Sequence, residues 1–571
     1  MSFCRACFFV FFLRISAVIC IGVSVAACGK ASQPSGATRG ETVVVGVGSD
    51  FDHLNPLLIQ LSISREVCTL LFPTLVRPKF DAATGELGYG PSLATSWRFS
   101  EDGKTATFTL RGDAKWSDGV AVTSADLKFS YRLYADTNVA STRQHYLDDL
   151  LLGAKGQIDF ERAVETPSDT VLVLHFNRSL AAAIVLDHFY DLMPVAKHIF
   201  ESIPPRLLRT HPVNLTPVVA GPFKVERWSK SRELVLVSNP ASVLPHRATV
   251  KRMIFRVIPE YTTRLTELRT GSIDVMMAGG GLAPKDAAGL QTSNPEIDIK
   301  TVRNRYFDSI VWLNIDGDLY RNKGVIKPNF FFGDKRVRQA MTYAINRQAI
   351  IDGFMQDYGH IVNTSLSPAY QTIIDTSLHG YGFNPDKARQ LLAEAGWTAG
   401  SNGKLQKDGR PFAFTLWSLT GNARRNYAAT IIQQNLKDIG IECKLEFAEP
   451  VVFSRNQNAP ELRYDAAISG LSAETLPFQL IIWNSDFKKS PFNSACFQSA
   501  RLDTVVKSLG TPQAKTDEQK LWREFQRILH EEQPRTFLYY YDELEGFNRR
   551  ITNAEVSMLA VLFNAYDWQV K

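Results

Sequence analysis

The sequence lacks the short motifs that mark most enzymes. Its ten histidines include no HExxH pair, the arrangement that binds catalytic zinc, and no GxSxG turn is present to expose a serine nucleophile. The dinucleotide fingerprint GxGxxG is incomplete after Gly46-Val47-Gly48, and the full phosphate-loop pattern GxxxxGK[ST] is missing. These absences disfavour hydrolases and nucleotide-binding enzymes. We predict no catalytic residue, no metal site and no cofactor.

Cysteine is scarce, and its distribution argues against a disulfide scaffold. Four of the seven cysteines lie within the first 28 residues, and the other three form no CxxC pair. The remaining three are far apart in the sequence, and we expect them to be small buried residues: Cys68, Cys443 and Cys496.

Charge of one sign is not concentrated anywhere in the chain. The formal net charge is +6 over 571 residues, and no dense Lys/Arg block with interleaved aromatics is present, so a nucleic-acid partner is not expected. Hydrophobic residues make up 45% and charged residues 21%, which is ordinary for a soluble globular protein. The length predicts two or three domains.

A long apolar run is found only near the N-terminus. Residues 15–27 (ISAVICIGVSVAA) follow Arg14 without a charge and lead into Cys28, which is typical of a signal peptide. The run is shorter than the about 20 residues of a membrane span unless the count crosses Arg14, which leaves a transmembrane anchor as the alternative. The letters VAAC resemble the bacterial lipoprotein box, so we predict a signal peptide over 1–28 with lipid attachment at Cys28, and a flexible tether over 29–40.

The stretch PSLATSWRFSEDGKTATFTLR combines several signals of local structure. Asp102-Gly103 is typical of a hairpin turn, and residues 105–110 alternate between threonine and apolar side chains, which predicts a strand with one buried face. Further on, Thr123 and Asp126 have the spacing of a capping box at the start of a helix. The large aromatic residues of this part of the chain are expected to pack in the core as scaffold: Trp97, Phe108 and Trp116.

The second half is richer in helical patterns. Helical spacing of apolar residues predicts helices over 335–354 and 427–439, and Asn384-Pro385 opens another that Gly396 closes. Gly440 stops the 427–439 helix, and IECKLEF then alternates as a strand. Helices mixed with strands throughout indicate an α/β protein.

These segments together resemble family 5 of the bacterial extracellular solute-binding proteins, which includes oligopeptide- and dipeptide-binding proteins. The long composite signature PSLATSWRFSEDGKTATFTLRGDAKWSDGVAVTSADLKFSYRLY carries the resemblance. Further matches follow in the expected order: AGPFKVERW, GSIDV, DKRVRQAMTYAINR, FNPDKARQLLAEAGW and YDAAISG. The resemblance covers essentially all of the chain after the tether.

The resemblance implies a three-domain periplasmic-binding-protein fold of the peptide-binding type, in which two lobes close on a ligand by a hinge. The second domain would comprise residues 77–217 and the third residues 302–541. The first domain would be discontinuous, with three parts: 41–76, 218–301 and 542–571.

The resemblance also implies where a ligand binds. In peptide-binding members, the segment after the YDAAISG-like strand supplies an aromatic residue and an aspartate that pairs with the amine of the ligand. Here that segment is Leu471-Ser472-Ala473-Glu474, with leucine and glutamate in those two places. A carboxylate buried there would require a cationic group on the ligand, whereas the alternative is a glutamate at the surface of a lobe.

Two further assignments follow from the same resemblance. Gln60, Leu61 and Ser62 match a loop that faces the start of the peptide. Arg143 lies in a loop of the second domain that lines the cleft, where it could receive a carboxylate by a bidentate contact, and a solvated arginine is the alternative.

The function implied is that of a substrate-binding lipoprotein of an ABC importer. It would be a monomer in the periplasm or at the cell surface, capturing peptides or peptide-like solutes and delivering them to a permease in the cytoplasmic membrane. Because the ligand segment departs from the family pattern, a non-peptide solute is the alternative: a nickel complex, haem, an opine, a sugar or a peptide antibiotic. An exported hydrolase, a folding helper and a signalling receptor are the alternatives from other classes.

Overall fold

A computed structural model describes residues 39–571 except 82, 245–246, 278–280, 402, 473–474, 488–489 and 491. The predicted signal peptide and Cys28 therefore lie outside the described residues. The predicted tether ends earlier than expected, because its last two residues already belong to a 3-10 turn, η1 (Arg39–Glu41). No helix in the described part of the chain is both long and apolar enough to cross a membrane.

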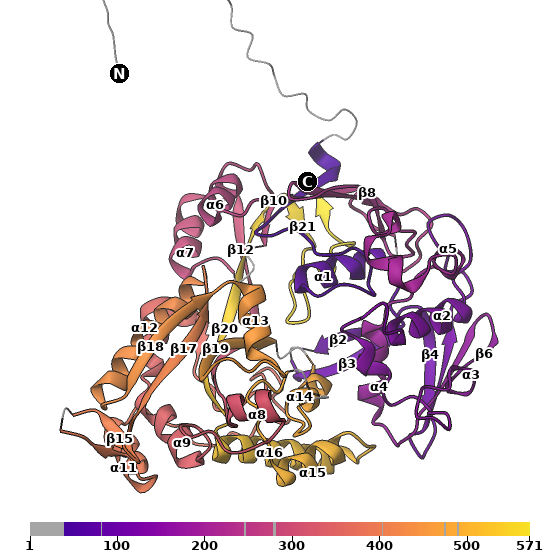
Figure 1. Ribbon diagram of the computed structural model, residues 1–571. Coiled ribbons are helices and arrows are strands. Elements are labelled where there is room, and N and C mark those ends of the chain that lie inside the picture. The colour runs from indigo at the N-terminus through magenta and orange to yellow at the C-terminus, as the bar shows by residue number, and fades with distance from the viewer. Residues whose placement is uncertain are drawn as a thin grey trace, which may run out of the picture.

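One large mixed sheet runs through the molecule (Figure 1). Its strand order is β18-β17-β19-β12-β20-β11-β1-β10-β9-β8, and β13 (Gly359–His360) pairs with β20 at the side. Five strands belong to the predicted first domain: β1 (Thr42–Val47), β8 (Phe223–Ser229), β9 (Glu233–Ser238), β10 (Arg252–Val257) and β11 (Val275–Met277). Four belong to the predicted third domain: β13, β17 (Ala413–Leu419), β18 (Glu442–Ala448) and β19 (Ala466–Ser472).

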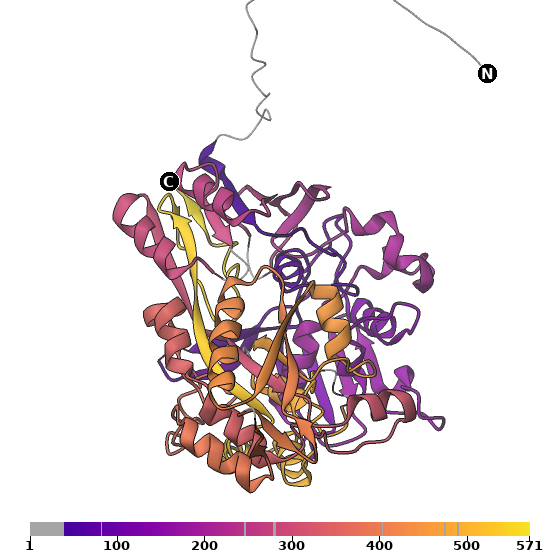
Figure 2. The same ribbon diagram turned by 60° about the vertical axis from the view of Figure 1, so that its left-hand side comes forward.

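Two long antiparallel strands join these halves of the sheet. β12 (Ile297–Trp312) and β20 (Arg535–Asn548) pair along most of their length, and Figure 2 shows β20, in yellow, running from the top of the molecule into its lower half. Their register shifts between Val302 and Tyr306, where the pairing passes from Glu543 to Tyr541. The ladder is thus interrupted beside the predicted domain boundaries at 301/302 and 541/542. A hinge at these boundaries would break few ladder hydrogen bonds when it bends.

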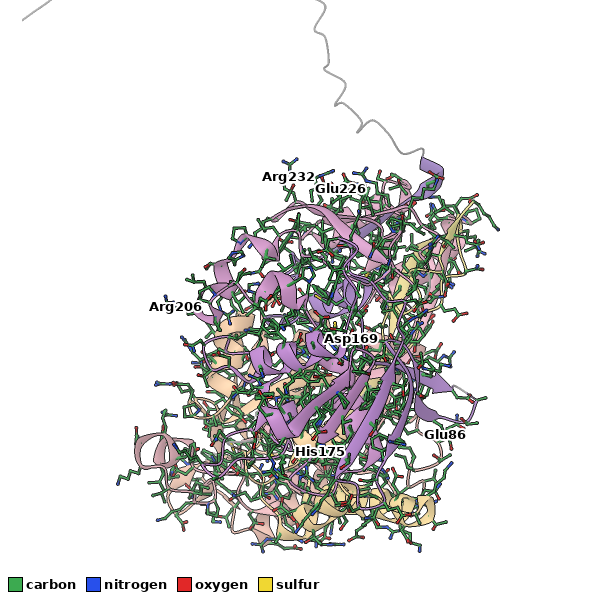
Figure 3. The ribbon with its side chains drawn as sticks, turned by 90° about the vertical axis from the view of Figure 1, so that its right-hand side faces the viewer. Glu86, Asp169, His175, Arg206, Glu226 and Arg232 are labelled. Atoms are coloured by element: carbon green, nitrogen blue, oxygen red, sulfur yellow. The ribbon has the colours of Figure 1, made fainter. Side chains whose placement is uncertain are left out.

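The predicted second domain contains a separate four-stranded antiparallel sheet with the order β4-β5-β7-β6. Figure 3 looks onto this sheet, with His175 at the end of β7 and Glu86 on the neighbouring hairpin. The strands are β4 (Ala94–Phe99), β5 (Thr105–Leu110), β6 (Val164–Ser168) and β7 (Val171–His175). The hairpin is formed by β2 (Val76–Asp81) and β3 (Glu86–Pro91).

The signature stretch folds as the sequence predicts. β4 and β5 form a hairpin around Gly103, whose φ of 65° is a conformation that favours glycine. The capping box is present, because Thr123 and Asp126 each accept a backbone N–H at the start of α2 (Ser124–Ala135). Phe108 and Trp116 are fully buried and therefore act as scaffold.

The helices of the third domain agree with the patterns, with two corrections. α11 (Pro385–Glu394) is capped by Asn384 as expected. α12 (Ala423–Asp438) starts four residues before the predicted start, because Asn422 caps its first turn. The predicted helix over 335–354 is broken after α9 (Lys335–Ala344), since Asn346 instead caps a new turn, α10 (Arg347–Ile350).

Two lobes pack against each other. We call residues 41–301 with 542–571 the N-terminal lobe and residues 302–541 the C-terminal lobe. Figure 1 shows most of the first in indigo and magenta at the top and right, and the second in orange and yellow at the left and bottom. The backbone N–H of Ala181 donates to the carbonyl of Gly510 at 3.0 Å, and the rings of Phe80 and Tyr370 meet edge to face.

Candidate functional site

The two lobes enclose two cavities between them. A cavity of about 710 Å³ lies between the second and third domains, and its lining includes Ile184 and His188 from α4 (Ala182–Asp191). Pro477 from α14 (Leu476–Ile482) forms part of the opposite wall. A second cavity of about 550 Å³ lies between the first and third domains. Both are within the size range of small-ligand sites, and ligands commonly bind between domains.

The first two residues of the predicted anchor segment, Leu471 and Ser472, are the last residues of β19. Leu471 pairs with Phe307 on β12, and Ser472 pairs with Tyr306. Ala473 and Glu474 lie outside the described residues, so the amine-binding role of Glu474 stays a prediction. β17 pairs with β19 only through residues 466 and 467, so its ladder ends before Leu471.

The predicted loop of the N-terminal lobe begins α1 (Ser62–Leu71). The backbone N–H of Gln60 donates to the Asp52 carboxylate at 2.7 Å, which holds the loop in place. Leu61 is 44% exposed and extended just before the helix, and Ser62 is exposed in its first turn. The structure brings this loop against Arg143, because Arg143 Nη1 donates to the carbonyl of Ile59 at 2.8 Å.

Arg143 is not the solvated arginine of the alternative, because its guanidinium is buried and paired. Its Nε donates to Asp191 at 2.8 Å, and Arg65 Nε donates to the other oxygen of the same carboxylate at 2.6 Å. Burial alone would raise the pKa of Asp191, but the two guanidiniums outweigh it and lower that pKa to about 2. A role for Arg143 in receiving a ligand carboxylate stays a prediction.

Sequence reasoning missed Asp187, a second acid on α4 at the junction of the lobes. Its side chain is buried, and it accepts a hydrogen bond from Tyr89 Oη at 3.0 Å. Thr475, which directly follows the predicted anchor segment, also hydrogen-bonds to it. The available signal was a charged residue inside the apolar helical run AAIVLDHFY, since a buried charge normally needs a partner.

A buried charge cluster stands beside the second cavity. Asp308 on β12 has no exposed surface, and Arg424 Nε and Arg425 Nη2 donate to its two oxygens at 3.0 and 2.8 Å. Tyr539 Oη donates to it at 3.2 Å, and Arg424 also lies over the ring of Tyr541. Burial raises the pKa of Asp308, but the two guanidiniums lower it to about 2. Because Arg424 and Tyr541 line the second cavity, this cluster holds part of its wall in position.

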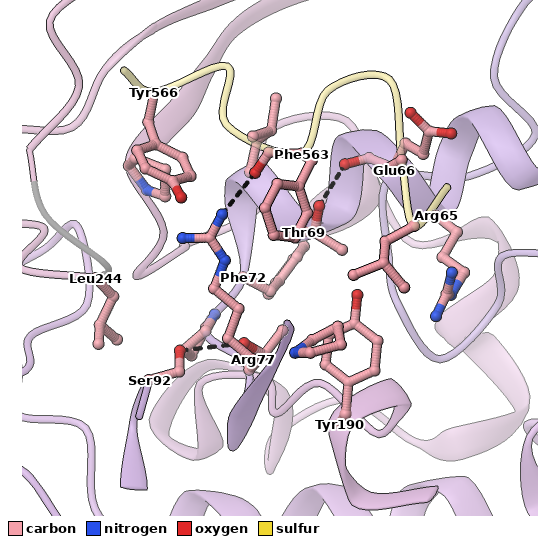
Figure 4. Close-up of a pocket in the computed structure, with 17 residues that line it drawn as sticks. Arg65, Glu66, Thr69, Phe72, Arg77, Ser92, Tyr190, Leu244, Phe563 and Tyr566 are labelled. Atoms are coloured by element: carbon pink, nitrogen blue, oxygen red, sulfur yellow. Dashed lines mark hydrogen bonds between the residues drawn. The ribbon is translucent and has the colours of Figure 1, made fainter. Parts of the chain in front are cut away.

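A third, smaller cavity lies where the C-terminal segment packs against the second domain. Figure 4 shows Arg77 of β2 between the rings of Phe563 and Tyr566, at 4.4 and 4.8 Å from their centroids. Arg77 Nη2 also donates to the carbonyl of Phe563 at 2.8 Å. The cavity holds about 60 Å³, enough for a few water molecules and too little for a peptide. The contacts of Arg77 with Phe563 and Tyr566 hold the C-terminal segment against the second domain.

The described residues contain no group of three or more His, Cys, Asp or Glu side chains arranged to hold a metal ion. All three cysteines after the leader are buried and free, which confirms the expectation from the sequence. Burial raises the pKa of Cys443 and of Cys496 to about 12 and keeps both thiols protonated at neutral pH.

Comparison with known proteins decides the family. The family model for bacterial extracellular solute-binding proteins, family 5 (Middle), matches residues 88–491. The chain belongs to this family. Its members are solute-binding proteins, so the predicted family and fold class are both confirmed.

Two of the following three relatives of this family 5 protein match over nearly the whole chain. The oligopeptide-binding protein AppA of Bacillus subtilis is 25% identical, covering 97% of this chain and 98% of its own. The periplasmic oligopeptide-binding protein OppA of Salmonella typhimurium is 24% identical and covers 91% of both chains. The nickel-binding periplasmic protein of Escherichia coli is 26% identical over 62% of both chains.

Solved structures show the same fold. The structure of Bacillus subtilis AppA in complex with a nonapeptide has a TM-score of 0.78 at 24% identity, covering 93% of this chain and 99% of the other. NikZ of Campylobacter jejuni in complex with Ni(L-His) has a TM-score of 0.77 at 21% identity, covering 93% and 100%. These two proteins share the fold although the solutes bound in their structures differ in chemistry.

Proposed function

We propose that this protein is the substrate-binding component of an ABC importer and captures peptides or peptide-like solutes between its two lobes. The observation that carries the proposal is the end of β19, where Leu471 pairs with β12 but lies beyond the last pairing with β17. A ligand backbone could continue the sheet there by strand addition, while the cavities between the lobes accept side chains. Main-chain pairing with roomy pockets tolerates many peptide sequences. The oligopeptide-binding names of AppA and OppA support the same ligand class.

We expect peptides to stabilise the full-length protein, purified in detergent, without being consumed. At a concentration 100 times its Kd, a ligand that binds only the folded state adds about 2.7 kcal/mol to the free energy of unfolding. The measurement is a thermal-shift screen with di- to hexapeptides, amino acids, nickel chelates, haem and opines. Mass spectrometry of the recovered peptide separates a binding protein from a hydrolase.

The controls for the predicted anchor are an N-acetylated peptide and Glu474→Ala. If both abolish the shift, Glu474 is the residue that receives the amine. A thermal shift that survives both changes would support the binding-protein function but contradict the role of Glu474 as the anchor of the ligand amine. A response only to nickel chelates, haem or opines would replace the peptide by that solute, and loss of uptake after gene deletion separates an importer from a receptor.

We further propose that lipidation of Cys28 holds the protein on the outer side of a membrane, as a tether of small polar residues after the lipoprotein-like box suggests. Cys28→Ser is expected to shift the protein from the membrane fraction to the soluble or uncleaved fraction and to abolish incorporation of labelled palmitate. Labelling that persists in Cys28→Ser would show that lipid is attached elsewhere. The matched control is Cys68→Ser, which changes a buried cysteine in the folded part of the chain.

A further inference from the structure

Two acids one turn apart on α4 have opposite surroundings. Asp187 and Asp191 are both 7% exposed, so both carboxyls have lost most of their water. Asp191 is paired with Arg65 and Arg143. In the described part of the chain, no Lys, Arg or His side chain forms an ion pair with Asp187. The protein therefore neutralises one of these two acids and supplies only hydroxyl donors to the other.

The ionised form of such a buried carboxyl is unfavourable unless a cation lies beside it. Burial raises the pKa of Asp187 to about 7, although the hydrogen bond from Tyr89 lowers it in part. Of the charged groups around it, Asp191 raises this pKa further and Arg65 lowers it. An uncompensated buried carboxylate is rare in proteins outside sites that bind a charged partner.

Asp187 lies at the contact between the lobes. Tyr89 approaches it from β3 in the N-terminal lobe, and Thr475 approaches it from the C-terminal lobe, directly after the segment predicted to bind the ligand. On the same helix, Ile184 and His188 line the cavity of about 710 Å³, and α14, which also lines that cavity, packs against α4. Asp187 therefore lies where the lobes meet, on a helix that forms part of the wall of the larger cavity.

We propose that Asp187 is a specificity-determining residue that receives a cationic group of the ligand, an ammonium or guanidinium, in the closed cleft. The inference rests on the proposed peptide-binding function and narrows it to peptides that carry a positive charge at this point. The cation would complete the hydrogen bonding that Tyr89 and Thr475 begin, and Asp187 would act from the lobe opposite to Glu474. The group recognised is either the amino terminus or a Lys or Arg side chain.

The test is isothermal titration of the full-length protein with a peptide found to bind it and with two neutral analogues. One analogue is N-acetylated, and the other has norleucine in place of lysine. For the wild-type protein, we expect one of the two to bind about 10- to 100-fold more weakly, as loss of a charge-assisted hydrogen bond predicts. The analogue that loses affinity identifies the source of the cation.

The decisive variant is Asp187→Asn, which keeps the shape of the side chain and removes its charge. We expect it to bind the charged peptide and the sensitive analogue within about threefold of each other. Asp187→Glu keeps the charge and should retain part of the difference in affinity between the charged peptide and its neutral analogue. This variant also serves as the test if Asp187→Asn does not fold. Asp386→Asn is the matched control, because Asp386 is an exposed acid on α11 that is not among the residues lining either large cavity, and the change removes the same charge. It should leave the discrimination unchanged.

Each other outcome overturns the inference in a distinguishable way. If Asp187→Asn discriminates as strongly as the wild type, Asp187 is not the residue that receives the cation. If the wild-type protein binds peptides but does not distinguish either neutral analogue, no cation is recognised and peptide binding still stands. If the wild type binds no peptide at all, the proposed function fails and this inference fails with it.

Discussion

Asp308→Asn is expected to lower the free energy of unfolding by about 3–5 kcal/mol, which is typical when one partner of a buried ion pair is removed. The wild-type carboxylate receives hydrogen bonds from Arg424, Arg425 and Tyr539 and has no exposed surface. A neutral amide cannot compensate two buried guanidiniums and would direct N–H donors at one of them. The measurement is urea-induced unfolding of both proteins at pH 7.

The matched control is Glu442→Gln, which removes an ion pair with Lys404 that is more than half exposed on both sides. Exposed pairs contribute about 0–1 kcal/mol, so this variant should unfold close to the wild type. An equal effect of the two substitutions would contradict the distinction between a buried and an exposed pair. Acid provides a second check, because a carboxyl with a depressed pKa stabilises above its unfolded value of about 4, and that contribution is lost as the pH falls through about 2.

Asp187 is expected to have the opposite dependence on pH. Its pKa rises from 3.8 to about 7 on folding, so between these values the folded state binds a proton that the unfolded state releases. The wild-type protein should therefore lose stability as the pH rises from 4 to 7, by about 4 kcal/mol from the size of this shift. Asp187→Asn should show no such loss from this position, since an amide does not titrate.

The measurement compares the free energies of unfolding of the two proteins at pH 4 and pH 8. We expect near-equality at pH 4, where the carboxyl is protonated, and a more stable variant at pH 8. A difference at pH 8 far below 2 kcal/mol would show that Asp187 gains water without unfolding, as opening of the lobes would allow. A wild-type protein that is more stable than the variant at pH 8 would contradict the absence of a compensating cation.

Local structure was predictable where neighbours in sequence decide it. The Asp102-Gly103 turn, the Thr123 capping box and the Asn384 cap all have the expected form, because a side chain bonds the backbone a few residues away. The break after Ala344 was missed for a related reason. Asn346 caps a new turn, and apolar spacing alone does not weigh that local alternative.

The candidate site was less predictable, since its contacts join distant parts of the chain. The loops of Gln60 and Arg143 were assigned separately, and only the structure shows that the carbonyl of Ile59, just before the first loop, accepts from Arg143. The pairing of Arg143 with Asp191 was not foreseen, because the two residues are 48 positions apart. Asp187 was missed because it stands out only by having no ion-pair partner among the described residues. A single sequence does not reveal which residues lie near it in space.

The sequence by itself determined the family, the α/β class and the helix starts at Thr123 and Asn384, because the signature stretch and the caps act within a few residues of one another. Only the tertiary structure decided which buried acids are neutralised. Asp187 and Asp191 are near neighbours on one helix with the same exposure, yet two arginines from other segments form ion pairs with Asp191, and no arginine among the described residues forms one with Asp187. The energy of a buried charge depends on groups within a few ångströms in space, and only the folded chain brings those groups together.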